Sequence, residues 1–524
     1  MGKSEFQPTN IAGHLAKEFV YNPATAIFAL TILAIGLVIL LINPREENPQ
    51  IVVSGGAVIV AMPGANANEI KSIIVEPMEK KLKEIDGIEH TYGIAKDDVG
   101  IVQASYYLGV DKQKADTKLY DKVIQNLDLL PNGAMQPMIK PFDIDADIPI
   151  VAIALYSPKN RASEIELYNK AKQLEKLLGQ IDNVSKINIK GGKKEQYNIL
   201  VDLLKLSGYH ISLVQISNAI KSTTTIVPNI SNSTKDGEKL VVIGIEHSIN
   251  TKQDIENIII AQYAGSVIYL KDIAKIEKSY NIQNLKEVNL KIRDKNGKFS
   301  QSFPMVTIEI SKFGGTNAVF VSSDVKEFLE KQKLNLQKLG IDYKIVKDDG
   351  DRANDSANEL LLNILASTVI IGLLIWITLG NRESLIVIST VPLIISLSLI
   401  FIYFYGMTLN RVSLFAILLT MGLLVDTGII VVENIHRHLY DYGDSDTMDN
   451  IVVSATDEMG NSANIATVAI MLTTLPGLLL TGMIGEFTKP IPVVMSVVLL
   501  SSLFVGYVFV PYAAKKIMKK KEKQ

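Results

Sequence analysis

Six apolar segments, each about as long as a bilayer core is thick, constrain the fold of this 524-residue chain more than any other feature. The first segment, PATAIFALTILAIGLVILLI, covers residues 23–42 and matches the roughly 20 apolar residues that a transmembrane helix needs. It lacks a small-residue cleavage site, so we predict a retained anchor and not a signal peptide. Five further transmembrane helices are predicted at residues 359–379, 385–405, 412–434, 461–482 and 490–513.

The distribution of lysine and arginine predicts how these helices are oriented. The C-terminal stretch YAAKKIMKKKEKQ carries six lysines, and Arg382 and Arg437 fall on the same side of a six-helix protein. Arg411 lies in the opposite short loops. Because short positively charged segments stay in the cytoplasm, we expect cytoplasmic termini, at residues 1–22 and 514–524, and an external segment at residues 43–357.

The external segment contains an internal repeat. Residues 79–88 read EKKLKEIDGI and residues 175–184 read EKLLGQIDNV, at an offset of 96 residues. Each copy ends a stretch with the apolar spacing of a helix, and β-branched runs typical of strands flank both. Repeated strand-helix-strand units of this kind predict ferredoxin-like (split βαβ) subdomains, unless two amphipathic helices resemble each other by chance. The expected fold class is therefore α+β, with membrane helices.

Composition excludes several functions. The chain has no cysteine, so thiol catalysis and zinc-thiolate sites are excluded. A net charge of -2 gives no reason to expect nucleic acid binding. GGKKE at 191–195 lacks the spacing of a phosphate-binding loop, and we interpret His436 and His438 as solvated residues at the membrane edge. We therefore expect no catalytic site, no cofactor and no resident metal.

The stretch GLLVDTGIIVVENI at 422–435 places Asp426 within the predicted fourth span. An ionised side chain at the centre of a membrane helix costs roughly 2.5 to 3.5 kcal/mol, so such residues usually have a function. A carboxyl group that gains and loses a proton is the minimal part of a proton relay; hydrogen bonding to a neighbouring helix is the alternative. Glu433 and Asn434 follow about two turns later and are weaker candidates, because Glu433 can equally be solvated. Thr427 suits helix packing at least as well as proton transfer.

Several motifs resemble those of the resistance-nodulation-division (RND) efflux transporters. GLLVDTGIIVVEN is similar to the fourth-helix motif of that family, and MPGANANEIKSIIVEPMEKKLKEIDGI to its first periplasmic signature. LLPNGAMQPMIKP resembles the crossover before the second subdomain, while GYHISLVQISNAI and VIYLKDIAKIE resemble docking-domain segments. TLGNRESLIVISTVPLIISLSLIFIYFYGMTLN is similar to the second-to-third helix region, so that the resemblance runs from about residue 15 to 515.

The resemblance implies a domain layout and a cellular setting. Expected are a first porter subdomain at 49–146, a second at 147–183 and 278–350, a docking subdomain at 184–277 and transmembrane helices two to six within 358–513. It also implies an inner-membrane protein, surrounded by lipid, whose large segment lies in the periplasm. The implied partners are a periplasmic adaptor protein, an outer-membrane channel and further copies in a trimer. The implied activity is transport and not enzymatic catalysis.

Two departures from the family pattern qualify the implied role of Asp426. This residue falls on the first of two adjacent aspartates that bind protons in the drug-pumping branch, but Thr427 stands at the second. An acid followed by a small residue, together with ENIHRHL at 433–439, resembles the heavy-metal branch instead. Met135 and Met138 in MQPM could bind soft metal ions, although packing is the commoner role of methionine.

The second departure is length. Family members usually hold two homologous halves, and this chain matches only the N-terminal half, without the lysine that the family places opposite the aspartate. We therefore expect a half-subunit of a split pump that exchanges protons for substrate, with the second half on another polypeptide. A homo-oligomer and a decayed gene fragment are the alternatives for its assembly. A six-span protein-export accessory subunit and a non-transporting scaffold are the alternatives for its function.

Overall fold

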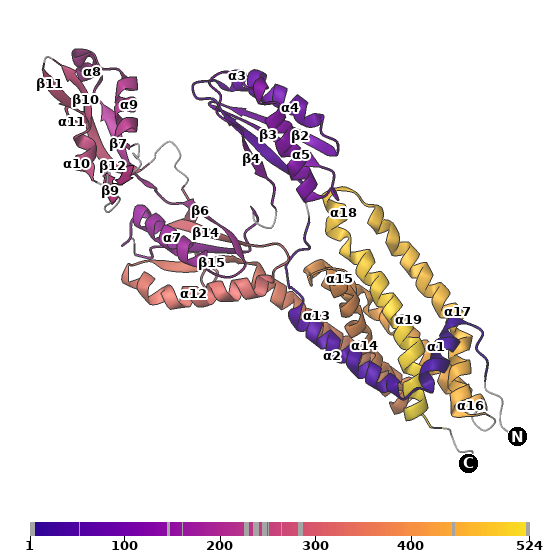
Figure 1. Cartoon of the computed structure of the whole chain (residues 1–524). Coiled ribbons are helices and arrows are strands. Elements are labelled where there is room, and N and C mark those ends of the chain that lie inside the picture. The colour runs from indigo at the N-terminus through magenta and orange to yellow at the C-terminus, as the bar shows by residue number, and fades with distance from the viewer. Residues whose placement is uncertain are drawn as a thin grey trace.

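A computed structural model describes residues 6–519 except 52, 144–146, 160, 225–229, 234–239, 244–248, 250, 264, 281–286 and 443–445. Part of the predicted C-terminal segment, residues 520–524, lies outside this range. A bundle of long helices forms one end of the molecule, and three α/β regions lie beyond its other end (Figure 1).

The helical bundle contains six segments in the described residues that are long and apolar enough to cross a membrane. Each overlaps one predicted range, but the second, fifth and sixth begin 10, 13 and 8 residues before the predicted starts. The fourth consists of two consecutive helices, α15 and α16. The helices are α2 (Ala24–Ile42), α13 (Asp349–Thr378), α14 (Asn381–Phe404), α15 (Arg411–Leu424), α16 (Asp426–Tyr442), α17 (Met448–Thr474) and α19 (Pro490–Ile517), and a 3-10 turn (Leu475–Leu479) extends α17.

Two shorter helices accompany the bundle. Helix α1 (Ile11–Val20) lies within the N-terminal segment and packs against α17 and α19. It sits beside the C-terminal end of α16, at the end of the bundle far from the α/β regions (Figure 1). Helix α18 (Gly482–Thr488) lies at the opposite end, directly before α19. The apolar-length criterion missed both, because neither is long enough to span a bilayer.

The first α/β unit follows α2 and has the strand order β2-β3-β1-β4, with every neighbouring pair antiparallel. Its helices pack on one face of the sheet, where Val58, Val102 and Ile74 are buried in the core. The chain order is β-α-β-β-α-β, that of a split βαβ unit. Its elements are β1 (Gly55–Ala61), α3 (Ala67–Ile70), a π-helical turn (Lys71–Val75), α4 (Glu76–Lys83), β2 (Ile88–Lys96), β3 (Val99–Tyr106), α5 (Lys112–Gln125), a 3-10 turn (Leu127–Leu129) and β4 (Met138–Pro141).

The second α/β unit repeats this arrangement. Strand β14 pairs with β6 and β5, and β5 pairs with β15, so the order β6-β14-β5-β15 corresponds to β2-β3-β1-β4. The repeated sequences at 79–88 and 175–184 fall at the ends of α4 and α7, which occupy equivalent places in the two units. The elements are β5 (Val151–Tyr156), α7 (Glu164–Leu178), β6 (Val184–Gly191), β13 (Asn289–Leu290), β14 (Phe303–Lys312), α12 (Ala318–Lys338) and β15 (Asp342–Asp348).

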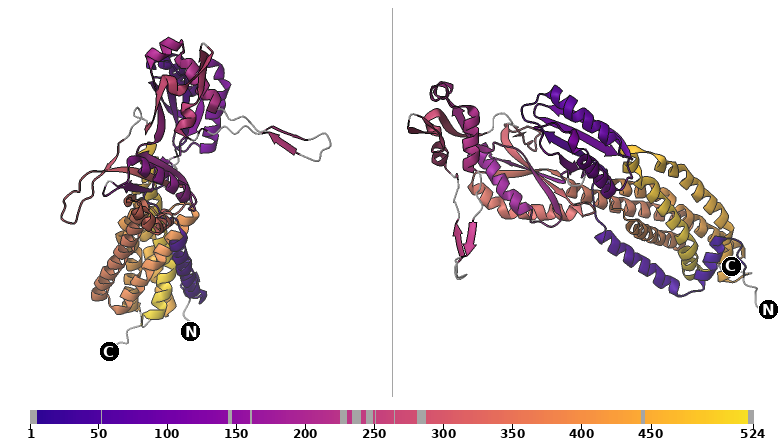
Figure 2. Two further views of the ribbon diagram at one scale, coloured as in Figure 1. Left: turned by 90° about the vertical axis from the view of Figure 1, so that its left-hand side faces the viewer. Right: turned by 45° about the horizontal axis from the view of Figure 1, so that its top comes forward.

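A further region is inserted between β6 and β14, and its boundaries correct the prediction. We expected the docking subdomain at 184–277, but β6 belongs to the second unit and β12 pairs with β7 up to Tyr280. The β8–β9 hairpin projects away from this region (Figure 2). Its elements are β7 (Glu195–Val201), α8 (Leu203–Tyr209), α9 (Leu213–Thr224), β8 (Ile230–Ser233), β9 (Leu240–Ile243), α10 (Lys252–Glu256), β10 (Ile259–Tyr263), β11 (Ser266–Tyr269), α11 (Leu270–Ile273) and β12 (Ala274–Tyr280).

A buried ion pair joins the second α/β unit to the helical bundle. Glu46 follows α2, and its carboxylate lies 2.5 Å from the ammonium of Lys312 at the end of β14. Both side chains are 5% exposed. Glu46 also accepts a hydrogen bond of 3.0 Å from the hydroxyl of Thr408, in the loop before α15. Because breaking a buried ion pair is strongly destabilising, this contact fixes the unit on the bundle.

Candidate functional site

Asp426 lies at a break in the fourth membrane segment. Helix α15 ends at Leu424, and Asp426 is the first residue of α16. We expected this aspartate within the fourth span, and it lies inside the segment Arg411–Asp441, directly after a local interruption at Val425. The carbonyl of Leu424 beside the break accepts a hydrogen bond of 2.5 Å from the hydroxyl of Ser502 on α19. A side chain from another helix therefore donates a hydrogen bond to a backbone carbonyl of α15 at this point. A side chain inserted into the backbone hydrogen-bond pattern is a recognised cause of local helix irregularity.

One face of α15 and the first half of α16 is largely exposed, although Ile429 and Ile430 in its middle are partly covered. Asp426 and Glu433 both lie on this face and are exposed. Within the part of the chain that the structure describes, neither carboxylate has an ion-pair partner. We call this surface the bare face; its exposed residues recur with the period of a helix and are Phe415, Leu419, Gly422, Asp426 and Glu433.

The exposure of Asp426 and Glu433 shows the direction in which their side chains point. We expected them to share a face that could point into the helical bundle. They do share one face, seven residues apart, but it is the outer surface of this chain. An ionised residue at the centre of a lipid-facing helix costs roughly 2.5 to 3.5 kcal/mol. A covering element on this face would remove that cost for Asp426.

The other two predicted residues lie on the opposite, packed face of α16. Thr427 is 7% exposed, and a β-carbon added at Gly506 of α19 would lie 2.9 Å from its methyl group. Such close approach of two helices at a glycine is typical of membrane packing. Asn434 is 5% exposed. Its amide donates hydrogen bonds to the carbonyl of Ala455, at 2.7 Å, and to Glu458, at 3.1 Å.

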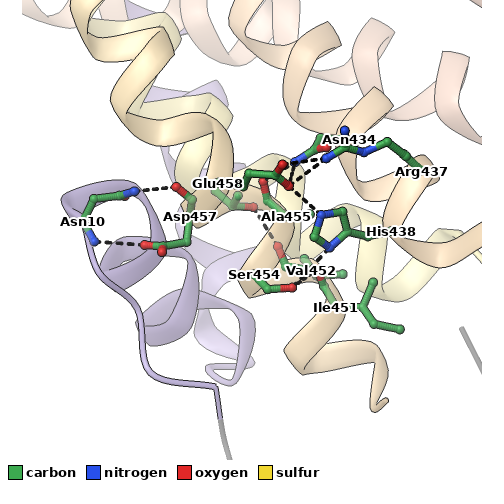
Figure 3. A network of polar contacts seen from close by, with 11 residues as sticks. Asn10, Asn434, Arg437, His438, Ile451, Val452, Ser454, Ala455, Asp457 and Glu458 are labelled. Atoms are coloured by element: carbon green, nitrogen blue, oxygen red, sulfur yellow. Dashed lines mark hydrogen bonds and ion pairs between the residues drawn. The ribbon is translucent and has the colours of Figure 1, made fainter. Parts of the chain in front are cut away.

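Glu458 of α17 organises the inner end of α16, a role that the sequence reading missed (Figure 3). Its carboxylate accepts hydrogen bonds from Arg437 at 2.7 and 2.8 Å. It also lies 2.6 Å from Nε2 of His438. Three residues of α16, Asn434 included, therefore converge on one side chain. The signal was present in the sequence, because Asp457 and Glu458 form an acidic pair directly before the predicted fifth span.

The preceding residue, Asp457, holds the N-terminal segment. Its buried carboxylate accepts hydrogen bonds from the backbone N–H groups of Thr9 at 2.9 Å and Asn10 at 3.0 Å. The hydroxyl of Thr9 also donates to it, at 2.6 Å. Asn10 is the N-cap of α1, so this acid positions α1 against α17 (Figure 3).

The two neighbouring histidines of α16 bind different helices. Nδ1 of His436 lies 3.0 Å from the carboxylate of Glu383 in the first turn of α14, whereas His438 faces Glu458 on α17. Our interpretation as a solvated residue is therefore wrong for His438, which is 12% exposed, whereas His436 is 45% exposed and also pairs with Glu383. The described residues contain no group of three or more histidine, cysteine, aspartate or glutamate side chains suited to a metal ion. Met135 and Met138 are 58% and 64% exposed.

Comparison with known proteins places the chain in a family. The sequence profile of the AcrB/AcrD/AcrF family matches residues 15–524. The swarming motility protein SwrC of Bacillus subtilis is 24% identical over 541 residues, which cover 96% of this chain and 50% of SwrC. The multidrug resistance protein MdtC of Salmonella arizonae is 25% identical over 499 residues, which cover 94% of this chain and 46% of MdtC. The chain thus spans about half the length of these relatives, and it belongs to the AcrB/AcrD/AcrF family of RND permeases.

Proposed function

We propose that this chain is one half of a proton-driven RND efflux pump that exchanges protons for substrate. The observation that carries this proposal is the position of Asp426 on the bare face of a membrane helix. Ionised and facing lipid, this group would cost roughly 2.5 to 3.5 kcal/mol. An acid retained at such a cost is best explained by a partner that covers it and by a function that needs its proton.

The proposed cover is the second half of the pump. The relatives SwrC and MdtC are about twice as long as the stretch that they share with this chain. The bare face of α15 and α16 is apolar toward Phe415 and acidic at Asp426 and Glu433. A matching surface would therefore present apolar side chains with one cation opposite Asp426, because opposite charges are expected where two helices bury an acid.

In the proposed mechanism Asp426 alternates between its protonated and ionised forms. Ionised, it would be held by the cation of the partner; protonated, it would release that cation, and α16 would move relative to the partner half. One proton crossing a potential of 100 mV supplies about 2.3 kcal/mol. That amount is sufficient to bias two conformations separated by a few kcal/mol. The packed position of Thr427 suggests that it anchors α16 on α19 instead of carrying protons.

The rest of the proposal concerns the cell envelope. We propose an inner-membrane location, with the two α/β units and the inserted region in the periplasm as porter and docking subdomains. Contacts such as that of Glu46 with Lys312 would transmit helix movement to the second unit. A periplasmic adaptor, an outer-membrane channel and trimeric assembly are the proposed partners. The name of MdtC makes antimicrobial compounds the first cargo to test, ahead of soft metal ions.

The test combines purification with transport. A tagged chain purified in mild detergent should bring with it a second membrane polypeptide that contributes an intramembrane cation. In inverted vesicles that contain both, the Asp426→Asn variant should abolish proton-driven accumulation of ethidium while the complex still forms. Asp355→Asn, outside the apolar part of α13, is the matched control. Undiminished transport by Asp426→Asn, or function without any second half or second copy, would overturn the proposal.

A further inference from the structure

We propose that His436, paired with Glu383, is the group through which the proton leaves the relay into the cytoplasm. This inference rests on the proposed function of Asp426. It goes beyond that function because it assigns an exit route within this chain. The observations that carry it are the spacing of three titratable residues along α16 and the different surroundings of His436 and His438.

The first observation is the distance that the proton must cover. His436 follows Asp426 by ten residues on the same helix, a rise of about 15 Å. This is half of the roughly 30 Å thickness of a bilayer core, so that a proton released at mid-membrane would reach the surface at His436. Glu383 supports this depth, because it lies in the first turn of α14, directly after the short loop that ends α13.

The second observation is the order of the groups. Glu433 follows Asp426 by seven residues and lies on the same bare face. His436 follows Glu433 by three residues, and residues three apart are neighbours on a helix surface. Asp426, Glu433 and His436 therefore follow one another along α16. Seven residues span about 10.5 Å of helix, which is too far for direct transfer, so the proton of Asp426 reaches the carboxylate of Glu433 through intervening water. Glu433 then gives a proton to the neutral imidazole of His436, and the imidazolium releases it to cytoplasmic water.

The third observation is the environment of the imidazole. The side chain of His436 is 45% exposed, whereas that of its partner Glu383 is 11% exposed. Histidine changes charge between about pH 5 and 8, which suits a group that releases protons into cytoplasm. Glu383 of α14 faces His436 at 3.0 Å. Other charged or titratable groups are its neighbours in sequence, Glu433, Arg437 and Tyr440 on α16, and Arg382 next to Glu383 on α14. The Glu383 carboxylate stabilises the imidazolium, and water can reach its exposed edge.

His438 provides an internal comparison. It lies on a different side of α16, its side chain is 12% exposed, and it shares Glu458 with Arg437 (Figure 3). Its Nδ1 also faces the hydroxyl of Ser454, at 3.4 Å. This histidine is enclosed between α16 and α17 and holds the two helices together. Two histidines in the same turn therefore have different functions, and only His436 adjoins the acidic series.

The experiment measures how transport depends on cytoplasmic pH. Inverted vesicles carrying the chain and its partner half accumulate ethidium while the outer medium, which bathes the cytoplasmic surface, is varied from pH 6 to 8. His436→Gln should lower the rate several-fold and flatten this pH dependence. Glu383→Gln should also lower the rate, because the imidazolium loses the carboxylate that lies 3.0 Å from its Nδ1. His438→Gln, the matched control, should keep the wild-type midpoint.

The outcomes separate this inference from the proposed function. If Asp426→Asn transports normally, the proposed function fails. If Asp426→Asn is inactive while His436→Gln and Glu383→Gln keep the wild-type profile, the exit route alone is wrong. If a variant fails to reach the membrane, a second experiment takes the place of the transport assay. The intact wild-type chain is titrated in nanodiscs, and the histidine ring carbons are followed by NMR. There, a His436 signal that does not titrate between pH 5 and 8 overturns the inference.

Discussion

The two faces of α16 differ in how their polar groups are satisfied. On the packed face, Asn434 finds its partners on α17, and Thr427 lies against a glycine of α19. On the bare face, Asp426 and Glu433 have no ion-pair partner among the described residues. The polar groups of the packed face find their partners within the chain, whereas we propose that those of the bare face find theirs only in an assembly. Stability should therefore depend on the packed face, and function on the bare one.

The largest expected difference comes from adding bulk to each face. Gly506→Leu would force a side chain into Thr427, because even a β-carbon there lies 2.9 Å from its methyl group. Overpacking of this kind costs about 1 to 3 kcal/mol. Gly422→Leu is the matched change on the bare face, where no atom lies within 4 Å of an added β-carbon.

Thermal unfolding in detergent checks this prediction. Gly506→Leu should lower the midpoint of the isolated chain by several degrees, whereas Gly422→Leu should leave it unchanged. Co-purification with the partner half should show the reverse order, with the larger loss for Gly422→Leu. Equal destabilisation by the two substitutions would contradict the distinction between a packed and a bare face.

A second prediction concerns Asp348, which caps the N-terminus of α13. Unlike Asp426 at the start of α16, this aspartate has its partners within the chain. Burial alone would raise the pKa of the Asp348 carboxyl. Hydrogen bonds from Lys326 at 2.8 Å, from Ser322 at 2.7 Å and from the N–H of Asp351 at 3.0 Å nevertheless hold this pKa below its ordinary value. Charged hydrogen bonds of this kind contribute about 2 kcal/mol.

The lowered pKa of Asp348 fixes how its contribution varies with pH. A depressed folded-state pKa stabilises the protein above the unfolded value of about 3.9, and that stabilisation is lost as the pH falls through the folded value. Asp348→Asn should therefore destabilise the chain at pH 7, and the difference from wild type should shrink below about pH 4. Asp324→Asn, an exposed change on α12, is the control. A difference that stays constant in acid would show that the cost is not electrostatic.

A third prediction compares two adjacent residues on opposite faces of α16. Asn434→Ala removes the hydrogen bonds to Ala455 and Glu458 and should cost about 1 kcal/mol, since polar contacts between membrane helices are worth about 0.6 to 2 kcal/mol. Glu433→Ala should cost the isolated chain almost nothing. Reversible unfolding in mixed micelles with increasing SDS measures both. A larger loss for Glu433→Ala would mean that the bare face already carries a contact within the chain.

The parts of the fold that depend on local pattern could be predicted from the sequence. Apolar length indicated the positions, though not the bounds, of the six segments in the described residues that are long enough to span a membrane. A run of about twenty apolar residues is typical of a membrane helix. The repeat at 79–88 and 175–184 located two helices that occupy equivalent places in the two α/β units. The residues on the packed face of α16, Thr427 and Asn434, were identified as candidates but could not be assigned to that face.

The remaining features depend on contacts between distant residues. The break before Asp426 involves Ser502, 78 residues beyond Leu424, and nothing in VDTG indicates it. Strand β6 belongs to the second α/β unit because it pairs with β14, more than a hundred residues later. Asp426 is exposed because none of the described residues covers that face. Helical spacing alone does not reveal whether a face is covered. The Glu458 cluster was missed because its three partners come from another helix.

The smallest expected effect concerns the break itself and tests whether it belongs to the packed face. Ser502→Ala removes the hydrogen bond to the Leu424 carbonyl, and we expect a loss of about 0.6 kcal/mol in the free energy of unfolding. If Ser502 only fills space, the loss in the free energy of unfolding should be the only effect of the substitution. If it shapes the break that orients Asp426, amide hydrogen exchange at residues 424–428 should also slow as the helix becomes regular. Ser501→Ala, at the neighbouring position of α19, is the matched control, and the same change in exchange for both variants would rule out a specific role for Ser502.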